Sequence, residues 1–138
     1  MYCLQRRDAA ATLSGAKRLG LKRDDTAPRT SAFFGSSRPP YTEWDWKDLE
    51  LHVGGPNFIQ LPSGRWIAAG RFYEEKKPFT QLAALDVEKK TVEPFLKLPS
   101  GGDTSYPGLV WHDNMLWVSY YSSHEGRTSI YLAKVRLN

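Results

Sequence analysis

Short apolar runs alternate with polar turn residues along most of this chain, from Thr30 to Leu137. Runs of this length, rich in β-branched and aromatic residues and without a helical period, are typical of β-strands. Clusters of Gly, Pro, Asp, Asn and Ser separate them, as turns require. The pattern therefore predicts an all-β chain, mostly antiparallel. The expected strands span residues 31–36, 43–51, 57–61, 65–71, 80–86, 92–98, 106–111, 115–121 and 129–137, with 2–7 as a tenth.

An internal repeat of about 50 residues organises these strands. Thr30, Thr80 and Thr128 each introduce an alternating strand, at spacings of 50 and 48 residues. Residues 61–71 and 111–121 match each other as strand, tight turn and strand at an offset of 50. Four antiparallel strands in a repeat of this length are typical of a β-propeller blade. The sequence therefore predicts a partial β-propeller.

The repeat divides the chain into blades and one insertion. Residues 1–8 and 30–52 form a first partial blade, interrupted by a basic insertion at 9–29 that we expect to be flexible. Residues 53–99 form a complete blade, and residues 100–138 form a last blade without its fourth strand. Propellers close with about four to eight blades. We therefore expect either N-terminal blades or further copies of the chain, as a homo-oligomer, to complete the ring.

The positive charge of the chain is concentrated near its start. The 138 residues carry a formal net charge of +4, which would suit a nucleic-acid-binding protein. Residues 1–30 hold seven basic and three acidic residues, whereas the rest of the chain holds twelve of each. A nucleic-acid-binding domain usually carries its basic surface on the folded body. We therefore expect no nucleic-acid partner, although a phosphate-binding basic arm stays open as a further class of function.

Several other classes of protein are excluded by what the composition lacks. No apolar run approaches the roughly 18 to 20 residues of a membrane-spanning helix, so we expect no membrane partner. Cys3 is the single cysteine, which excludes a disulfide framework, and His52 and His112 lack the spacing of metal ligands. We expect no metal and no cofactor. The residues after Met1 lack the apolar stretch of a signal peptide, which predicts a cytoplasmic protein if Met1 is the true start and leaves export of a longer parent open.

Two motifs resemble the late blades of sialidases, also called neuraminidases. One begins with Gly54-Gly-Pro-Asn and ends its second strand in Arg71. The other, Asp103-Thr-Ser-Tyr-Pro-Gly, leads an inner strand, and the next strand ends in aromatic and polar residues at Tyr121. On these motifs, residues 37–137 resemble the C-terminal part of a sialidase-like six-bladed propeller of the BNR-repeat kind. The resemblance implies hydrolysis of a terminal sialic acid or another acidic sugar from a glycan.

The resemblance also implies roles for individual residues. Sialidases use a neutral tyrosine as nucleophile, because the carboxylate of the sugar would repel a carboxylate nucleophile. Tyr106 falls at this position, and Arg71 falls at the position of an arginine that binds the carboxylate. Apart from the resemblance, Asp103 precedes Tyr106 and could serve as a local base, or as a turn residue after Gly-Gly. The internal repeat adds Arg7 as a second arginine. The remaining candidates for contact with the sugar are Asn57, Tyr121, His124 and Glu125.

The sequence departs from a complete sialidase site, and each candidate has a structural alternative. No acid lies near residues 55–57, where the family has a glutamate, and the general acid and first arginine belong to earlier blades. We therefore expect the isolated chain to be an inactive piece of a glycoside hydrolase, with a glycan or small carbohydrate as ligand. Tyr106 and Arg71 could instead serve packing, and residues 122–126 could form a polar hairpin. The alternatives as a whole are a non-catalytic glycan-binding or scaffold propeller and a five-bladed glycosidase.

Overall fold

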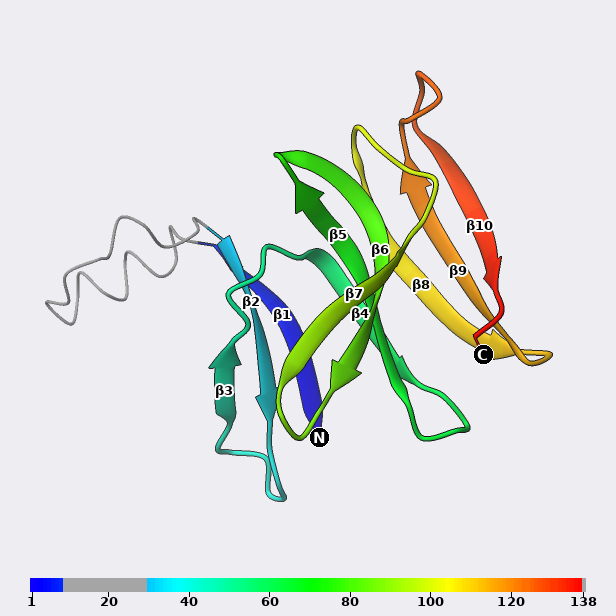
Figure 1. Ribbon diagram of the computed structural model, residues 1–138. Helices are drawn as coiled ribbons and strands as arrows, with labels where there is room; N and C mark the ends of the chain where they lie inside the picture. Colours follow the sequence, from blue (N-terminus) through cyan, green and yellow to red (C-terminus); the bar gives the residue numbers. More distant parts are fainter. Residues whose placement is uncertain (9–29, 138) are drawn as a thin grey trace, which may run out of the picture. The chain divides into compact units, whose positions relative to one another are not determined.

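All ten predicted strands are present in the computed structural model, which describes residues 1–8 and 30–137. Within these residues there is no helix, and so none that is long and apolar enough to cross a membrane. The strands form three antiparallel sheets of three, four and three strands (Figure 1). The protein is therefore all-β, as its sequence predicts. The predicted basic insertion at 9–29 lies outside the described residues.

Each sheet is built from strands that follow one another in the chain. The strand orders are β1-β2-β3, β4-β5-β6-β7 and β10-β9-β8. Sequential hairpins of this kind are the simplest antiparallel topology, because a short turn returns the chain beside the strand that it has just left. The bounds are β1 Tyr2–Asp8, β2 Thr30–Ser36, β3 Asp45–Asp48, β4 Gly54–Gln60, β5 Trp66–Glu74, β6 Lys77–Asp86, β7 Thr91–Lys97, β8 Thr104–His112, β9 Met115–Ser122 and β10 Ser129–Val135.

The chain divides into two compact units, Met1–His52 and Val53–Asn138. The first unit contains the sheet β1-β2-β3. Ala32 and Phe34 of β2 are fully buried, and the ring of Phe34 stacks on that of Tyr2 with 5.6 Å between centroids. This unit thus has its own small apolar core on its central strand.

The third strand of the first unit is shorter than predicted. The alternating pattern predicts a strand over residues 43–51, but β3 covers only Asp45–Asp48. The carboxylate of Asp48 accepts a hydrogen bond from the backbone N–H of Glu50 at 2.8 Å, and Glu50 has a φ of 54°. An Asp that bonds the backbone two residues on favours a turn over an extended strand, which ends β3 early.

The second unit packs its two sheets against each other. Strand β8 lies against β4, β5 and β6, so that the sheet β10-β9-β8 covers one face of the sheet β4-β5-β6-β7 (Figure 1). Both sheets contribute to one buried apolar cluster, which is the sheet-on-sheet arrangement that buries apolar faces most simply. Its members are Leu61, Ile67, Ala69, Leu82, Leu98, Leu116, Val118 and Tyr120.

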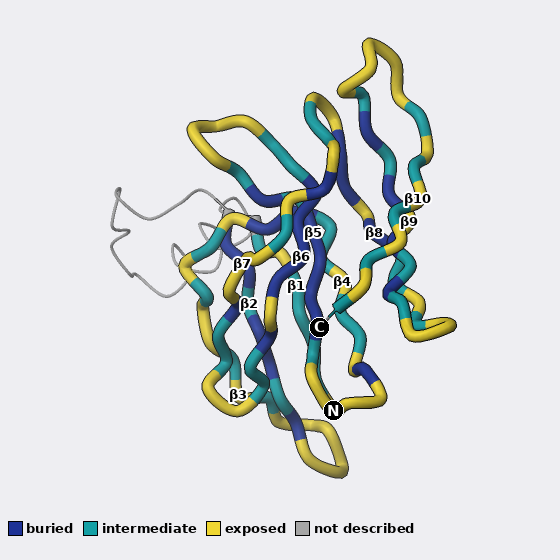
Figure 2. The backbone as a smooth tube through the Cα atoms, turned by 45° about the vertical axis from the view of Figure 1, so that its right-hand side comes forward, coloured by how far each residue is buried: buried dark blue, intermediate teal, exposed yellow. Residues whose placement is uncertain are grey.

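Burial along the strands follows their positions in these layers. Strands β5 and β6 contain runs of buried residues and form the dark centre of the second unit (Figure 2). Strand β9 instead alternates, with Leu116, Val118 and Tyr120 turned to the core. Because successive side chains of a strand point to opposite faces, Tyr121 lies on the face of its sheet away from this core.

Two hairpins of the second unit have two-residue loops of the same geometry. Residues 75–76 (Glu-Lys) join β5 to β6, and residues 113–114 (Asp-Asn) join β8 to β9. All four residues have a positive φ, between 47° and 68°. Two successive positive φ values define the type I′ turn, which matches the twist of an antiparallel pair. Asp-Asn is typical of this turn, whereas Glu-Lys is not, so only the second loop could be expected from its residues.

Thr80, the repeat threonine of the complete sheet, joins the two sheets of the second unit. Its hydroxyl lies 2.7 Å from the hydroxyl of Thr104, and both residues are fully buried. The Thr104 hydroxyl donates its one proton to the backbone oxygen of Tyr121, also at 2.7 Å. Thr80 must therefore be the donor to Thr104, which makes a directed chain from β6 through β8 to β9. This chain ends beside the candidate site.

Candidate functional site

Four candidate residues meet at one end of the second unit: Arg71, Asp103, Tyr106 and Tyr121, called here the tyrosine–arginine cluster. The Tyr121 hydroxyl donates a hydrogen bond of 2.8 Å to Oδ1 of Asp103, and the Arg71 guanidinium lies 3.4 Å from the same oxygen. The rings of Tyr106 and Tyr121 stack with 6.1 Å between their centroids. The cluster joins residues of both sheets, because Arg71 belongs to β5 while Tyr106 and Tyr121 belong to β8 and β9.

Two glycines make room for this cluster. A Cβ at Gly54 would lie 2.9 Å from Nε of Arg71, and a Cβ at Gly55 would lie 2.5 Å from the Ser105 hydroxyl and 2.9 Å from the ring of Tyr106. All three distances are shorter than the contacts that real Cβ atoms make. Gly55 also has a φ of 52°, a conformation that glycine adopts without strain. The Gly-Gly step therefore lets an arginine and a tyrosine from different sheets approach the same point of β4.

Tyr106 projects into solvent from an irregular part of β8. Its φ is 50°, and it lies within a register shift between Ser105 and Gly108. The side chain is 68% exposed, whereas its neighbours Ser105 and Pro107 are buried. Opposite it, β4 has its own register shift between Gly54 and Asn57, and the Asn57 amide donates a hydrogen bond of 3.0 Å to the Pro107 oxygen. Bulges of this kind redirect side chains and are common beside active sites.

The Arg71 guanidinium keeps bonding capacity that the protein does not use. Its Nε is buried and has no hydrogen-bond partner. Its contact with Asp103 at 3.4 Å is longer than the roughly 2.7–2.9 Å of a strong charge-assisted hydrogen bond. The Arg71 side chain is 21% exposed and that of Asp103 is 66% exposed, so solvent weakens the pair further. Arg71 thus has one buried donor without a partner and only a weak contact with Asp103, which leaves its terminal nitrogens able to bind another anion.

Tyr121 stays protonated to a higher pH than an ordinary tyrosine. Partial burial raises the pKa of its phenol, and the hydrogen bond to Asp103 and the negative charge of that carboxylate raise it further. The positive charge of Arg71 acts in the opposite direction. Tyr121 is neutral at pH 7 as any tyrosine is, and its raised pKa keeps its hydroxyl as a donor to Asp103 to higher pH. Asp103, which the sequence pairs with Tyr106, has its hydrogen bond with Tyr121 instead.

Asp103 is itself oriented by the loop that follows β9. The Ser123 hydroxyl accepts a hydrogen bond of 2.8 Å from the Asp103 backbone N–H. A Cβ at Gly102, whose φ is 62°, would lie 2.4 Å from the same hydroxyl. Ser123 and Gly102 therefore hold the carboxylate at the end of the sheets. Sequence analysis did not predict Ser123, Gly102, Gly54 or Gly55 as site residues. The glycines nevertheless belong to the two Gly-Gly steps that mark the repeat boundaries in the sequence.

Arg7 belongs to the first unit and has aromatic partners there. Its guanidinium lies 4.3 Å from the ring centroid of Phe33 and 4.7 Å from that of Trp46, distances typical of cation–π contacts. The strand register also shows that Arg7 is not the structural equivalent of Arg71 in the repeat. Arg71 pairs with the repeat threonine Thr80, whereas Arg7 pairs with Ser31, one residue beyond Thr30. The residue of β1 that pairs with Thr30, as Arg71 pairs with Thr80, is Asp8. Because successive side chains of a strand point to opposite faces, Arg7 lies on the other face of its sheet from that position.

His124 and Glu125 lie in the hairpin between β9 and β10. The Glu125 carboxylate accepts a hydrogen bond of 2.8 Å from the Tyr131 hydroxyl, and the His124 ring lies 4.7 Å from the Tyr131 ring. Nδ1 of His124 is 2.9 Å from the Ser122 hydroxyl. These contacts are local to the hairpin, as its structural interpretation expects. The predicted sugar contacts of His124 and Glu125 stay predictions, separate from the tyrosine–arginine cluster.

Among the described residues, no three His, Cys, Asp or Glu side chains converge as a metal site would require. A scan against protein-family models and a search of curated proteins found no match to this chain. The site must therefore be interpreted from its own chemistry. It combines an arginine with available donors, two tyrosines and one carboxylate at the end of two packed sheets.

Proposed function

We propose that this chain is part of a sialidase-like β-propeller, and that its tyrosine–arginine cluster binds the acidic sugar of a glycan. Two packed sheets support the propeller. The sheet β4-β5-β6-β7 has the strand number and order of a complete blade, and the sheet β10-β9-β8 has the order of the first three strands of the next. The resemblance to sialidase blades supports the choice of ligand. The observation that carries the proposal is one connected cluster, in which Arg71 and Tyr121 contact Asp103 and Tyr106 stacks on Tyr121. The resemblance assigns roles to two of its members, Arg71 and Tyr106.

Arg71 is the group that would bind the carboxylate of the sugar. A guanidinium binds a carboxylate with two parallel hydrogen bonds, which no neutral sugar can offer in return. Its present partner is the exposed Asp103 at 3.4 Å, and exposed pairs contribute at most about 1 kcal/mol. A ligand carboxylate with better geometry would therefore compete for Arg71 at small cost.

The tyrosines would bind and orient the sugar ring. Tyr106 is 68% exposed and offers its ring and hydroxyl to a ligand. Tyr121 offers a second hydroxyl, which is neutral at pH 7 as in any tyrosine, and its raised pKa extends that state to higher pH. A neutral phenol next to a carboxylate suits the parent reaction, in which tyrosine attacks the anomeric carbon and the carboxylate accepts the phenol proton. Tyr106 is the nucleophile that the resemblance assigns, and Tyr121 is the tyrosine that bonds Asp103.

We expect this chain to bind the sugar without hydrolysing it. The resemblance assigns the general acid and the first arginine to earlier blades outside this sequence, and the later arginine has no clear counterpart between residues 80 and 103. Catalysis needs a proton donor for the leaving group. Release of a fluorogenic aryl group from an aryl sialoside checks this expectation. The predicted result is no release above the rate without protein. Measurable release that Tyr106→Phe abolishes would contradict it.

Calorimetric titration tests the binding itself. The probes are the methyl α-glycoside of N-acetylneuraminic acid and the methyl ester of its carboxyl group. We expect the free acid to bind at least roughly tenfold more tightly than the ester, and Arg71→Ala to remove that difference. Arg136→Ala is the matched control, since this exposed arginine follows β10 and lies outside the cluster. Equal affinities for acid and ester in the wild-type chain would contradict the proposed ligand.

A further inference from the structure

The hairpin between β9 and β10 closes in a tight turn whose two central residues are His124 and Glu125. The Gly126 backbone N–H donates a hydrogen bond of 3.2 Å to the Ser123 oxygen, and Gly126 has a φ of 86°. A hydrogen bond from the fourth residue back to the first is characteristic of a β-turn. His124 and Glu125, called here the hairpin pair, are both exposed on this turn.

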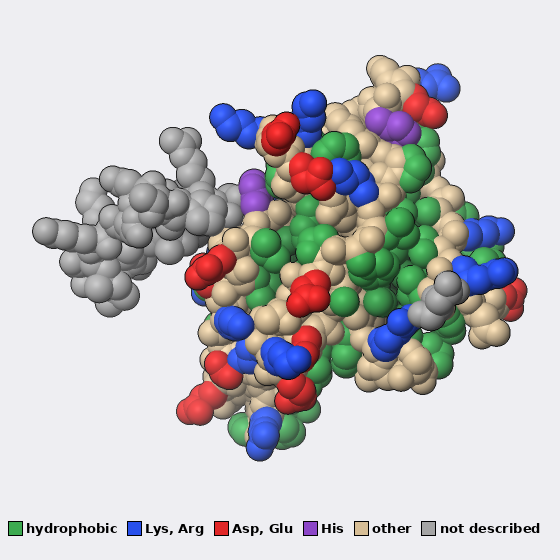
Figure 3. All heavy atoms as spheres, in the orientation of Figure 1, with side chains coloured by type: hydrophobic (Ala, Val, Ile, Leu, Met, Phe, Trp, Pro, Cys, Tyr) green, Lys and Arg blue, Asp and Glu red, His purple; other side chains and the backbone are tan. Residues whose placement is uncertain are grey.

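The hairpin pair lies at the same end of the second unit as the tyrosine–arginine cluster. The β9–β10 hairpin and the loop before β8, which carries Asp103, end on the same side (Figure 1). Figure 3 shows a histidine beside acidic and basic side chains over this hairpin. Ser123, whose hydroxyl accepts the hydrogen bond from the Asp103 N–H, directly precedes the pair. Neighbouring Cα atoms are about 3.8 Å apart, so a ligand in the cluster can extend to the hairpin.

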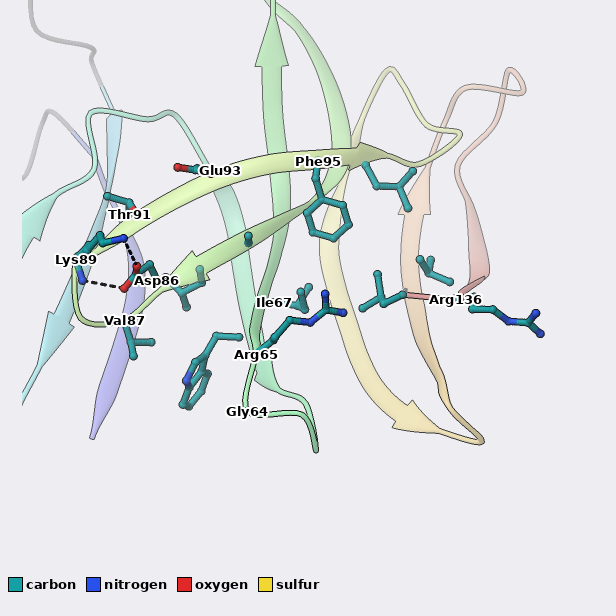
Figure 4. Close-up of a pocket in the computed structure, with 16 residues that line it drawn as sticks. Gly64, Arg65, Ile67, Asp86, Val87, Lys89, Thr91, Glu93, Phe95 and Arg136 are labelled. Atoms are coloured by element: carbon teal, nitrogen blue, oxygen red, sulfur yellow. Dashed lines mark hydrogen bonds and ion pairs between the residues drawn. The ribbon is translucent and has the colours of Figure 1, made fainter.

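The groove of the second unit lies at the opposite end of the strands. It has a volume of about 1020 Å³ and is lined by the start of β5 and by the ends of β6 and β10. An ion pair of 3.3 Å between Lys89 and Asp86 lies at its rim (Figure 4). Arg71 lies in the second half of β5, and the hairpin pair precedes β10. The length of the strands therefore separates the groove from both, so its residues serve as controls.

The ring of His124 is oriented by the buried hydroxyl of Ser122. This hydroxyl accepts a hydrogen bond of 3.0 Å from the Gly101 N–H and donates its own proton to the Gly101 oxygen at 3.1 Å. Nδ1 of His124, at 2.9 Å, is then assigned as a donor, because a Ser122 proton turned toward it would leave two oxygen lone pairs facing each other. The neutral ring thus carries its proton on Nδ1, and its Nε2 is an acceptor on the other side of the ring.

The Glu125 carboxylate also has one oxygen bound and one available. Oε2 accepts the hydrogen bond of 2.8 Å from the Tyr131 hydroxyl. The Tyr131 ring packs against those of Tyr120 and His124, at 5.7 Å and 4.7 Å between centroids, which keeps its hydroxyl in place. Within the described part of the chain, no donor bonds the other oxygen of Glu125. The hairpin pair therefore presents two acceptors, each fixed by a hydrogen bond on its other side.

We infer that the hairpin pair binds the hydroxyl groups of a second, neutral sugar, to which the acidic sugar is linked in a glycan. The inference rests on the proposed function, because the acidic sugar held by the tyrosine–arginine cluster brings the second sugar to the hairpin. Two neighbouring acceptors suit a ligand with several hydroxyl donors, and the Glu125 carboxylate disfavours a second acidic sugar. The glycosidic bond makes the second contact intramolecular, so weak hydrogen bonds are enough to add affinity.

Two probes that share the acidic sugar test this inference. Sialyllactose carries lactose where the methyl α-glycoside of N-acetylneuraminic acid carries a methyl group. Calorimetric titration of the full chain gives both affinities, and we expect sialyllactose to bind roughly tenfold more tightly. In spectra of the ¹⁵N-labelled chain, sialyllactose should shift the amides of residues 124–126, and the methyl glycoside should not.

Two variants keep the internal hydrogen bonds of the hairpin and replace only the acceptors that face the ligand. In His124→Asn, the side-chain amide can still donate to Ser122, but no acceptor remains at the position of Nε2. In Glu125→Gln, the amide oxygen still accepts from Tyr131, and an NH₂ group replaces the available oxygen. Each variant should reduce the advantage of sialyllactose at least roughly threefold and leave the affinity for the methyl glycoside within about twofold.

His112→Asn and Glu93→Gln are the matched controls. His112 ends β8 and Glu93 lines the groove, so both exposed residues lie away from the hairpin, and both changes should preserve the advantage of sialyllactose. Binding of the methyl glycoside without any advantage for sialyllactose would overturn the inference and leave the proposed function in place. An equal loss for both probes in His124→Asn would also overturn it, because the hairpin would then act only by positioning Asp103. Absence of binding by either probe would overturn the proposed function, and this inference with it.

Discussion

At the scale of single residues, the buried threonine pair shows how a repeated residue acquires a structural role. Thr80 donates to Thr104, and Thr104 donates to the Tyr121 oxygen. Thr80→Val removes the donor and leaves the buried Thr104 hydroxyl without its incoming bond, so we expect the free energy of unfolding to fall by about 1–3 kcal/mol. Urea denaturation measures this. Thr128→Val at the exposed repeat threonine is the control and should change stability by less than about 0.5 kcal/mol; equal losses at both positions would contradict the interpretation.

Tyr106 illustrates strain at a candidate site. With a φ of 50°, a residue with a side chain pays a backbone cost that glycine avoids. We expect Tyr106→Gly to be more stable than Tyr106→Ala by roughly 0.5–1 kcal/mol in urea denaturation, while both lose sugar binding. The same pair of changes at Val110, an exposed strand residue outside the positive-φ set, should give the opposite order. The same order at both positions would mean that the conformation of Tyr106 stores no strain.

The titration of Tyr121 tests the electrostatics of the cluster. Its pKa is raised by burial and by Asp103, so the folded chain holds this proton to a higher pH than the unfolded chain does. The resulting stability is complete below the ordinary tyrosine pKa and is lost as the pH rises through the folded value. We expect Asp103→Asn to lower the pKa of Tyr121 in an NMR titration of ¹³Cζ-labelled tyrosine.

Glu125→Gln is the matched control for that titration. Burial and the Glu125 carboxylate raise the pKa of Tyr131, so this variant should lower the pKa of Tyr131 and leave that of Tyr121 in place. An unchanged Tyr121 in Asp103→Asn would show that Asp103 does not accept its hydrogen bond in solution.

Single residues of the site could be predicted only in part. Arg71 and Tyr106 follow from motif resemblance, Asp103 from its position before Tyr106, and Tyr121 from the end of its strand. The structure joins all four in one cluster. Asp103 bonds Tyr121 rather than Tyr106, which lies in the bulge of β8 against Gly55. No local pattern encodes such an approach, because it joins residues about 50 positions apart.

At the scale of elements, the turn residues predict only one of the two tight hairpins of the second unit. Residues 113–114 (Asp-Asn) signal a turn, whereas residues 75–76 (Glu-Lys) adopt the same positive φ values against their preference. The pairing of β5 with β6 over nine residue pairs imposes this turn on its two residues. Likewise, β3 ends early because of an Asp48 hydrogen bond that hydrophobic alternation does not reveal.

A change of turn residues tests this account of the hairpins. Replacing residues 75–76 by Asn-Gly should raise the free energy of unfolding by roughly 0.5–1 kcal/mol, because these residues accept positive φ readily. Calorimetric melting should show an increase of roughly 2–4 °C. Residues 88–89 are also Glu-Lys but lie in the longer β6–β7 loop, where Asp86 accepts both of their backbone N–H groups. The same replacement there should give no gain, and equal gains would contradict a specific role of the turn type.

At the scale of the whole molecule, the repeat of about 50 residues predicted how the strands group into sheets, which no single strand pattern could do. A period of about 50 residues with turn signals predicts antiparallel sheets of up to four strands, and the described residues contain three such sheets. The residue-level periodicity could not predict how the second unit closes around its core. That arrangement depends on contacts such as those of Leu61 and Leu98 with Leu116 and Val118, which lie far apart in sequence.

The central claim is that the tyrosine–arginine cluster binds an acidic sugar, and mapping by NMR tests it most directly. The methyl α-glycoside of N-acetylneuraminic acid is titrated into the ¹⁵N-labelled chain. The account predicts saturable shifts centred on the amides of residues 54–55, 71, 103–106 and 121–123, which Arg71→Ala removes. Shifts centred elsewhere in the chain, or none at saturating sugar, would contradict it.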